Sequence, residues 1–333
     1  MDNYIGLDVH YQSTTAVVLN SKGEEVLRQV LPTREFHLRK FLSSINGSKA
    51  LTFEEGCMAK WLVGVMHGCV DKLLVCNPIY VTKKSKAKTD YIDALHLAKE
   101  LRAGNLVQVF HDHENPLLDM RLLVSAYRSL VRQNVQSKNR YKAMFRAEGI
   151  DLPSGESCYT DYELNFKLYS PVRREITMRL QVQISEQQNA KNIYLEKFKK
   201  VSKYLPEIEK VRQLPGIEYV RAITIASIVG DANRFPNKYH FWSYCGLVNH
   251  KQISGGTTYS YKKSRGRREL KEVFMGAALS CIQGKDNAFR ALYERLRSKG
   301  IDDRSARKAV ARKLASVSLT IMRTGNNYDE SLI

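Results

Sequence analysis

Four acidic residues near the start of the chain have the residue type and the spacing of a metal site. Asp8 lies within the apolar segment 3–9, where an unpaired carboxylate would be costly to bury. Glu54 ends a second apolar segment, and Asp90 and Asp93 fall three positions apart on one face of a helical pattern. Carboxylates are the ligands that Mg²⁺ prefers, and two such ions about 3.5–4 Å apart can activate a phosphodiester. If the four acids meet, they predict a site for two Mg²⁺ that cuts or transfers nucleic-acid strands.

Each of these residues also has a purely structural interpretation. Asp8 can cap a turn at the end of a strand, and Asp90 with Asp93 matches the negative charge that favours any helix N-terminus. Glu54 or Glu55 can simply be a surface residue, and Glu55 is an alternative to Glu54 as the ligand. We interpret His10 as a polar residue at a strand end rather than as a ligand.

The elements that must position the acids follow in a recognisable order. Apolar periodicity predicts an antiparallel meander of three strands at 3–9, 14–19 and 25–30. It then predicts a helix at 35–45, a strand at 50–53, a helix at 58–67, a strand at 73–76 and a helix at 90–102. This order is typical of a ribonuclease-H-like mixed sheet, in which the first strand, the fourth strand and the last helix converge on one spot. The acids lie on those three elements.

The remainder of the chain is predicted to be mainly helical. Two helices without Gly or Pro, at 117–148 and 172–203, flank a loop at 153–155 and favour an antiparallel hairpin that serves as an oligomerising arm or as a plain linker. A tight turn at 214–217, a helix at 219–229, a polar stretch around 254–266 and helices at 267–283 and 303–322 follow. We therefore expect an α/β domain at 1–112, a helical hairpin at 113–205 and a mainly helical domain at 206–333.

Two features of the last region could contact or attack a phosphate. The turn Leu214-Pro215-Gly216-Ile217 resembles the hairpin of helix-hairpin-helix modules, whose backbone amides contact phosphates. Ser254 lies on a polar segment that we expect to be flexible, among the cations Lys251, Lys262, Lys263, Arg265, Arg267 and Arg268. A serine hydroxyl can attack a phosphodiester when a base or metal removes its proton and cations stabilise the developing charge. Judged by spacing alone, however, Ser-Gly-Gly is usually only a loop.

The charge of the chain points to a polyanionic partner. The formal net charge is +19 and the pI is about 9.6, yet the first 80 residues are neutral. The excess is concentrated in residues 259–313 and in the run that contains Lys83, Lys84, Lys86 and Lys88. Such a distribution is the footprint of nucleic-acid binding, because cations that neutralise phosphates release counterions.

Other classes of protein are excluded by composition. No apolar run is long enough for a membrane span, and the start of the chain lacks the pattern of a secretory signal. The six cysteines form no Cys-x-x-Cys pair, which argues against a zinc knuckle or a disulfide framework. We expect a reduced protein of the cytoplasm.

Several short motifs together resemble one family, the insertion-sequence transposases of the IS110 (one-ten) type, which include Piv-like invertases and RNA-guided recombinases. The matching segments occur in family order over roughly residues 4–280. They are Tyr4–Asp8, Phe53–Gly56, Lys88–Ala94, Leu214–Ile217, Tyr244–Val248 and Ser254-Gly255. Glu218 departs from the turn that is usual in the family, and Glu55-Gly56-Cys57 is not the commonest run after its glutamate.

The resemblance implies a fold, a chemistry and partners. It implies a RuvC-like domain whose four acids are Asp8, Glu54, Asp90 and Asp93, and a nucleophilic serine, Ser254, that is joined transiently to DNA. It further implies a homo-oligomer (a dimer or tetramer), donor and target DNA, and a structured non-coding bridge RNA that pairs with both. The cell would be bacterial or archaeal, with the protein at the nucleoid.

Two other functions remain compatible with these residues. A RuvC-like, Mg²⁺-dependent, junction-resolving nuclease would use the four acids to activate water, with Ser254 as a structural residue. A non-catalytic nucleic-acid scaffold would use only the basic segments.

Overall fold

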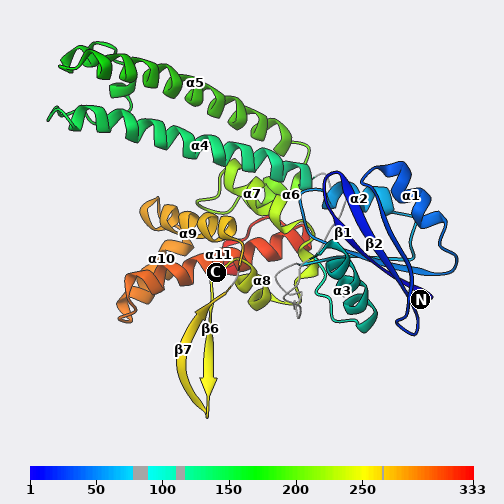
Figure 1. The fold of residues 1–333 in the computed structure, drawn as a ribbon. Coiled ribbons are helices and arrows are strands. Elements are labelled where there is room, and N and C mark those ends of the chain that lie inside the picture. Colours follow the sequence, from blue (N-terminus) through cyan, green and yellow to red (C-terminus); the bar gives the residue numbers. More distant parts are fainter. Residues whose placement is uncertain (78–88, 110–116, 265) are drawn as a thin grey trace. The chain divides into compact units, whose positions relative to one another are not determined.

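The computed structural model describes residues 1–77, 89–109, 117–264 and 266–333 (Figure 1). The chain divides into two compact units, Met1–Glu114 and Asn115–Ile333, which we call the N-terminal and the C-terminal unit. None of the helices in the described residues combines the length and apolar character that a bilayer crossing requires. The division into three domains stays a prediction.

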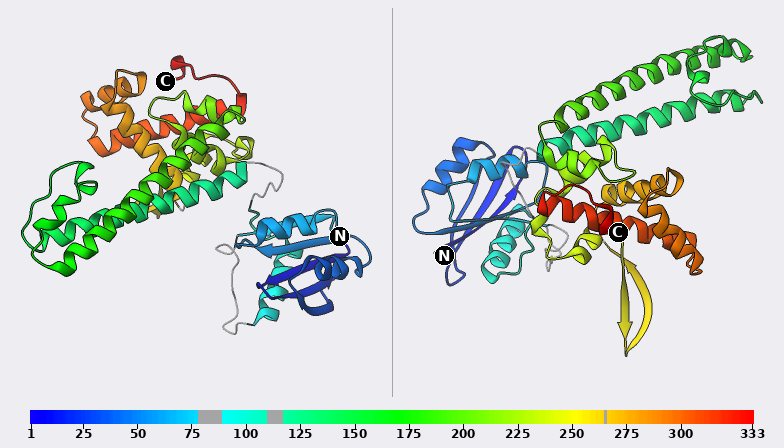
Figure 2. Two further views of the ribbon diagram at one scale, coloured as in Figure 1. Left: turned by 90° about the horizontal axis from the view of Figure 1, so that it is seen from above. Right: turned by 180° about the vertical axis from the view of Figure 1, so that it is seen from behind.

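The N-terminal unit is a five-stranded mixed sheet with helices on both faces (Figures 1 and 2). The strand order is β3-β2-β1-β4-β5, in which β1 pairs antiparallel with β2 and parallel with β4. The elements are β1 Asn3–Val9, β2 Ser13–Asn20, β3 Glu25–Pro32, α1 Glu35–Ser43, β4 Lys49–Glu54, α2 Ala59–Met66, β5 Lys72–Cys76 and α3 Asp90–Ala103. The expected α/β arrangement is confirmed, and it is consistent with a ribonuclease-H-like domain.

Alternation along the strands divides the core of this unit between two faces. Ile5 and Leu7 of β1 are buried with residues of α1 and α2 on one face. Tyr4 and the neighbouring even-numbered positions face α3, whose Ala94 and Leu97 are buried there. Residues one position apart on β1 therefore lie on opposite sides of the sheet.

The C-terminal unit begins with two long helices, α4 Leu117–Arg146 and α5 Pro171–Ser202, which run side by side (Figures 1 and 2). A polar contact joins them, because the Gln181 side chain of α5 donates to the Tyr141 hydroxyl of α4 at 3.1 Å. Gln181 also accepts from Asn165, in the segment between the two helices, at 2.6 Å. The two helices lie where periodicity predicted them. Their use as an oligomerising arm stays a prediction.

The rest of this unit is a helical body from which one hairpin projects (Figure 1). Its elements are α6 Pro206–Arg212, α7 Tyr219–Val229, α8 Lys238–Tyr244, β6 Asn249–Ser254, β7 Thr257–Lys263, α9 Arg268–Gln283, α10 Ala288–Ser298 and α11 Asp303–Thr324. Buried residues of α7, α9 and α11 form the centre of the core. The turn between α6 and α7 closes with a hydrogen bond from the Ile217 amide to the Leu214 carbonyl at 3.0 Å. Its contact with phosphates stays a prediction.

Candidate active site

The parallel pairing of β1 and β4 places Asp8 and Glu54 at the same level of the sheet. Leu7 is the register partner of Phe53, and both are buried in the core against α1 and α2. The next residue on each strand points to the other face. Asp8 and Glu54 therefore lie on the face covered by α3.

Close approach of α3 to β1 positions the two aspartates of the helix. A Cβ atom on Gly6 would lie 2.2 Å from the Ala94 carbonyl oxygen and 2.5 Å from the Ala98 nitrogen, so only glycine fits between strand and helix. The Thr89 hydroxyl caps α3 by accepting from the Ile92 amide at 3.3 Å. The helix therefore begins at Asp90, beside the end of the strand that carries Asp8.

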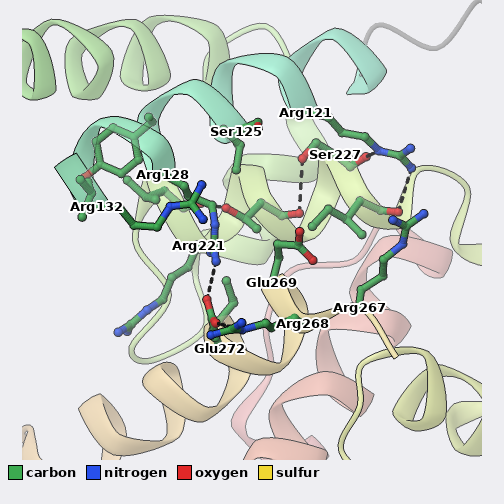
Figure 3. Close-up of a pocket in the computed structure, with 17 residues that line it drawn as sticks. Arg121, Ser125, Arg128, Arg132, Arg221, Ser227, Arg267, Arg268, Glu269 and Glu272 are labelled. Carbon is green, nitrogen blue, oxygen red and sulfur yellow. Dashed lines mark hydrogen bonds and ion pairs between the residues drawn. The ribbon is translucent and has the colours of Figure 1, made fainter. Parts of the chain in front are cut away.

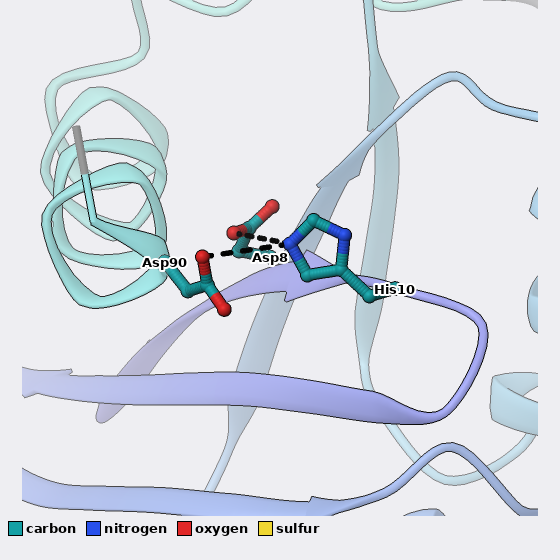
Figure 4. A group of neighbouring side chains, drawn as sticks. All are labelled: Asp8, His10 and Asp90. Atoms are coloured by element: carbon teal, nitrogen blue, oxygen red, sulfur yellow. Dashed lines mark ion pairs between the residues drawn. The ribbon is translucent and has the colours of Figure 1, made fainter.

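Asp8, His10 and Asp90 form the centre of the site (Figure 4). The His10 Nε2 atom lies 3.3 Å from an Asp8 carboxylate oxygen and 3.6 Å from an Asp90 carboxylate oxygen. Potential ligand atoms of the three side chains all lie within 4.8 Å of one another. This is the only such group among the described residues, and it joins the end of β1 to the start of α3.

The electrostatics of Asp8 suit a cation-binding group. Burial raises the pKa of Asp8, the charges of Asp90 and Asp93 raise it further, and His10 opposes the shift. The Asp8 side chain is 23% exposed, so the carboxylate is only partly solvated. A divalent cation would relieve this repulsion.

Asp93 and Glu54 lie nearby but outside the 4.8 Å group. Asp93 is one helical turn after Asp90, and its charge acts on Asp8. Glu54 is the register partner of Cys76. Burial, together with the charge of Glu54, raises the pKa of the Cys76 thiol to about 11. Register places Glu54 on the Asp8 face, whereas the choice between Glu54 and Glu55 as a ligand stays a prediction.

His10 is the residue of this group that the sequence pattern favours as a strand-end polar side chain rather than as a ligand. The structure places its Nε2 atom within 3.6 Å of the carboxylates of both Asp8 and Asp90, although 57% of its side chain is exposed. A signal was available, because His10 follows Asp8 by two positions and residues with that spacing can project to the same side of an extended chain.

Ser254 lies on a β-hairpin, a regular element that we did not predict for this polar segment. It is the last residue of β6 and pairs with Thr257 of β7. Gly255 and Gly256 have φ values of +55° and +79°, the left-handed conformation at both central positions of a type I′ turn. Ser254 is exposed at this tip, and within the described residues no side chain is hydrogen-bonded to its hydroxyl.

The predicted nucleic-acid contacts are only partly described. Lys262 is exposed on β7, where it pairs in register with His250, and Lys263 ends the same strand. Arg267 and Arg268 are exposed at the start of α9, and Arg268 forms an ion pair with Glu272 at 2.8 Å. The others lie outside the described residues: Lys83, Lys84, Lys86, Lys88 and Arg265.

Two family models match the chain. A transposase model named for the DEDD domain of IS110 transposases matches residues 5–148, which contain the four acids. A model of the IS116/IS110/IS902 transposase family matches residues 208–294, which contain Ser254.

The curated proteins that this chain resembles are also transposases or gene-inverting proteins, and the similarity covers most of both chains. A putative transposase, y4qE, of Sinorhizobium fredii is 25% identical over 96% of this chain and 88% of that protein. Pilin gene-inverting proteins of Moraxella lacunata and Moraxella bovis are 22% and 24% identical, each over 83% of this chain and 79% of the relative.

Proposed function

Because the chain belongs to the IS110 family of transposases, we propose that it cuts and rejoins DNA with divalent metal ions in its N-terminal unit and with Ser254 as the nucleophile. The observation that carries the proposal is the convergence of Asp8 and Asp90 on one point from two separate elements. Asp8, Glu54, Asp90 and Asp93 would hold the ions, which we propose are two Mg²⁺.

The residues present fit such an ion. Their donor set is dominated by carboxylates, as hard divalent cations require, and departs from an all-oxygen set only through His10. When bound, the ions would polarise a phosphodiester and stabilise charge on its oxygens. The carboxylates would hold and orient these ions, and Gly6 lets α3 approach β1 closely enough to bring Asp90 beside Asp8.

In the proposed strand transfer, each bond that forms replaces one that breaks, so no additional reactant is needed. The Ser254 hydroxyl loses its proton to a base and its oxygen forms a bond to phosphorus, while one P–O bond of the DNA backbone breaks. The departing sugar oxygen takes up a proton. In rejoining, a sugar hydroxyl gives up its proton and its oxygen bonds to the phosphorus of the serine–DNA linkage. The P–O bond to Ser254 breaks, and the serine oxygen takes up a proton. Exposure of Ser254 at the tip of the β6–β7 hairpin supports this role, because DNA can reach it.

The partners that we propose are donor and target DNA, a structured non-coding RNA encoded beside the protein, and further copies of the chain. The net charge of +19 supports contact with nucleic-acid backbones. Lys262, Arg267 and Arg268 would make such contacts, together with the basic run that contains Lys83.

Two sets of variants test the chemistry on DNA that carries the ends of the element. Asp8→Asn and Asp90→Asn should abolish cutting, with Glu55→Gln and Glu54→Gln deciding which glutamate is needed. Ser254→Ala should lose both strand exchange and the covalent protein–DNA adduct seen on a denaturing gel. Ser260→Ala is the matched control, since Ser260 lies on the same hairpin but its hydroxyl is engaged with Gln252. Cutting that persists in Ser254→Ala would instead identify a nuclease that uses water.

A further inference from the structure

A cavity of about 770 Å³ lies within the C-terminal unit between α4, α7 and the first turn of α9 (Figure 3). This volume falls in the range of ligand pockets, about 300–1,000 Å³. The lining contains two glutamates, Glu269 and Glu272, and six arginines: Arg121, Arg128, Arg132, Arg221, Arg267 and Arg268. The cavity is therefore strongly cationic, and no part of the metal site contributes to it.

Two of the arginines are fixed in place by the protein. Arg121 donates to the carbonyl oxygens of Ser227 and Ile228, at 2.6 and 3.0 Å. Arg221 donates to the Gly216 carbonyl and, at 2.9 Å, to the Ser280 hydroxyl. Arg221 is partly buried, which lowers its pKa, and in the described part of the chain no carboxylate is hydrogen-bonded to it.

Arg128 and Arg268 converge on one carboxylate, that of Glu272. Arg128 donates to one of its oxygens and Arg268 to the other, the latter at 2.8 Å. Burial opposes ionisation of Glu272, but these two hydrogen bonds and the positive charges prevail and lower its pKa. The cavity thus already stabilises one oxyanion between two guanidinium groups.

We propose that this cavity binds the phosphodiester backbone of a single nucleic-acid strand. Arg121, Arg128 and Arg132 project from α4, and the eleven residue steps from the first to the last give a row of about 16 Å. Such a row is too long for one small anion but suits successive phosphates. A guanidinium group can donate two parallel hydrogen bonds to one phosphate, and the positive end of the α9 helix dipole would attract the same charge.

The walls favour a strand over an inorganic anion. Val124, Val131 and Val273 line the cavity together with Tyr127, and such apolar and aromatic surfaces can contact sugars and bases. A cavity of this size admits a segment of one strand, whereas a duplex could only lie across its opening. This inference rests on the proposed function, because it supplies the strand that a DNA recombinase must hold.

One substitution can block the cavity without removing an arginine. Ser125 is exposed and lines the cavity on α4 (Figure 3), so Ser125→Glu puts a carboxylate among the guanidinium groups. Gln136→Glu adds the same charge at an exposed position of α4 outside the cavity. We expect Ser125→Glu to weaken binding of labelled oligo(dT) or oligo(U) 20-mers at least about tenfold relative to Gln136→Glu, by fluorescence anisotropy of the full chain.

A second substitution should act in the opposite direction. Glu272→Gln releases Arg128 and Arg268 and should tighten binding more than Glu294→Gln, which removes an exposed carboxylate paired with Arg290 on α10. These changes in affinity support the proposal whether they occur with oligo(dT), with oligo(U) or with both. The oligonucleotide that shows them identifies the bound strand as DNA, as RNA or as either. Equal binding by Ser125→Glu and Gln136→Glu, no extra effect of Glu272→Gln, or no binding by the unmodified chain would overturn it. These results are independent of the Asp8 and Ser254 variants, so the two proposals can fail separately.

Discussion

Replacement of Asp8 by Asn should have opposite effects on stability with and without divalent metal. Without metal, the Asp8 charge is unfavourable, because burial and the charges of Asp90 and Asp93 raise its pKa. A raised pKa means that the stability present below the ordinary aspartate pKa is lost as pH rises through the raised value. At neutral pH, Asp8→Asn should therefore stabilise the metal-free protein, by less than about 1 kcal/mol because the contact with His10 at 3.3 Å is also lost.

With metal bound, Asp8→Asn should instead be less stable than the unmodified protein. An ion at 100 times its dissociation constant stabilises the folded unit by about 2.7 kcal/mol. For the unit Met1–Glu114 this corresponds to a rise of about 10 °C in its melting temperature. Asp8→Asn removes one of the proposed ligands and should lose most of that rise.

Differential scanning calorimetry of the full chain, with Mg²⁺ or Mn²⁺ against NaCl of equal ionic strength, measures both effects. Glu35→Gln is the control, since it removes an exposed charge from α1 of the same unit. Without metal, the advantage of Asp8→Asn should disappear in acid below the ordinary aspartate pKa. Two results would refute this reasoning about Asp8. One is a full metal-dependent rise in the melting temperature of Asp8→Asn, and the other is a lower stability of Asp8→Asn in the absence of metal.

Three further perturbations have outcomes that the structure specifies. Gly6→Ala should cost about 1–3 kcal/mol in urea unfolding and should weaken metal binding, because its Cβ would displace the Ala94 carbonyl; unchanged metal affinity would contradict the role of this contact. Ser254→Ala should change stability by less than about 0.5 kcal/mol while strand exchange is lost, so a large drop in the unfolding midpoint would show that the residue is structural. Glu272→Gln should cost less than about 1 kcal/mol at neutral pH, because Glu272 is 44% exposed. This difference should vanish as pH falls through the lowered pKa of Glu272, and a difference that persisted in acid would exclude the ion pairs as its cause.

The sheet and the helices around it were predictable because their apolar residues repeat with a clear period. Strands β1, β4 and β5 are short apolar runs between turns, and α3 has a threonine cap before its first acid. Element order then sufficed to place Asp8 and Asp90 together. The long helices α4 and α5 were equally evident, since neither contains a glycine and the only proline of either is at the first position of α5.

The hairpin that carries Ser254 was missed because both of its faces are largely polar. Lys251, Gln252 and Lys262 give no alternation between apolar and polar positions, although Gly255-Gly256 was itself a hairpin signal. The arginine-lined cavity could not be inferred from local patterns. Arg128, Arg221 and Arg268 come from three helices and meet only through tertiary packing.

The contact at Gly6 makes the two faces of the sheet in the N-terminal unit differ in their tolerance of substitution. Main-chain atoms of β1 and α3 set the span between Asp8 and Asp90 there, with no adjustable side chain in between. Ile5 and Leu7, which pack against α1 and α2, can therefore be exchanged for other apolar residues of similar volume without changing the spacing of Asp8 and Asp90. Substitutions meant to change which ion is preferred should therefore alter the packing of α3 against β1 rather than the core beneath α1 and α2.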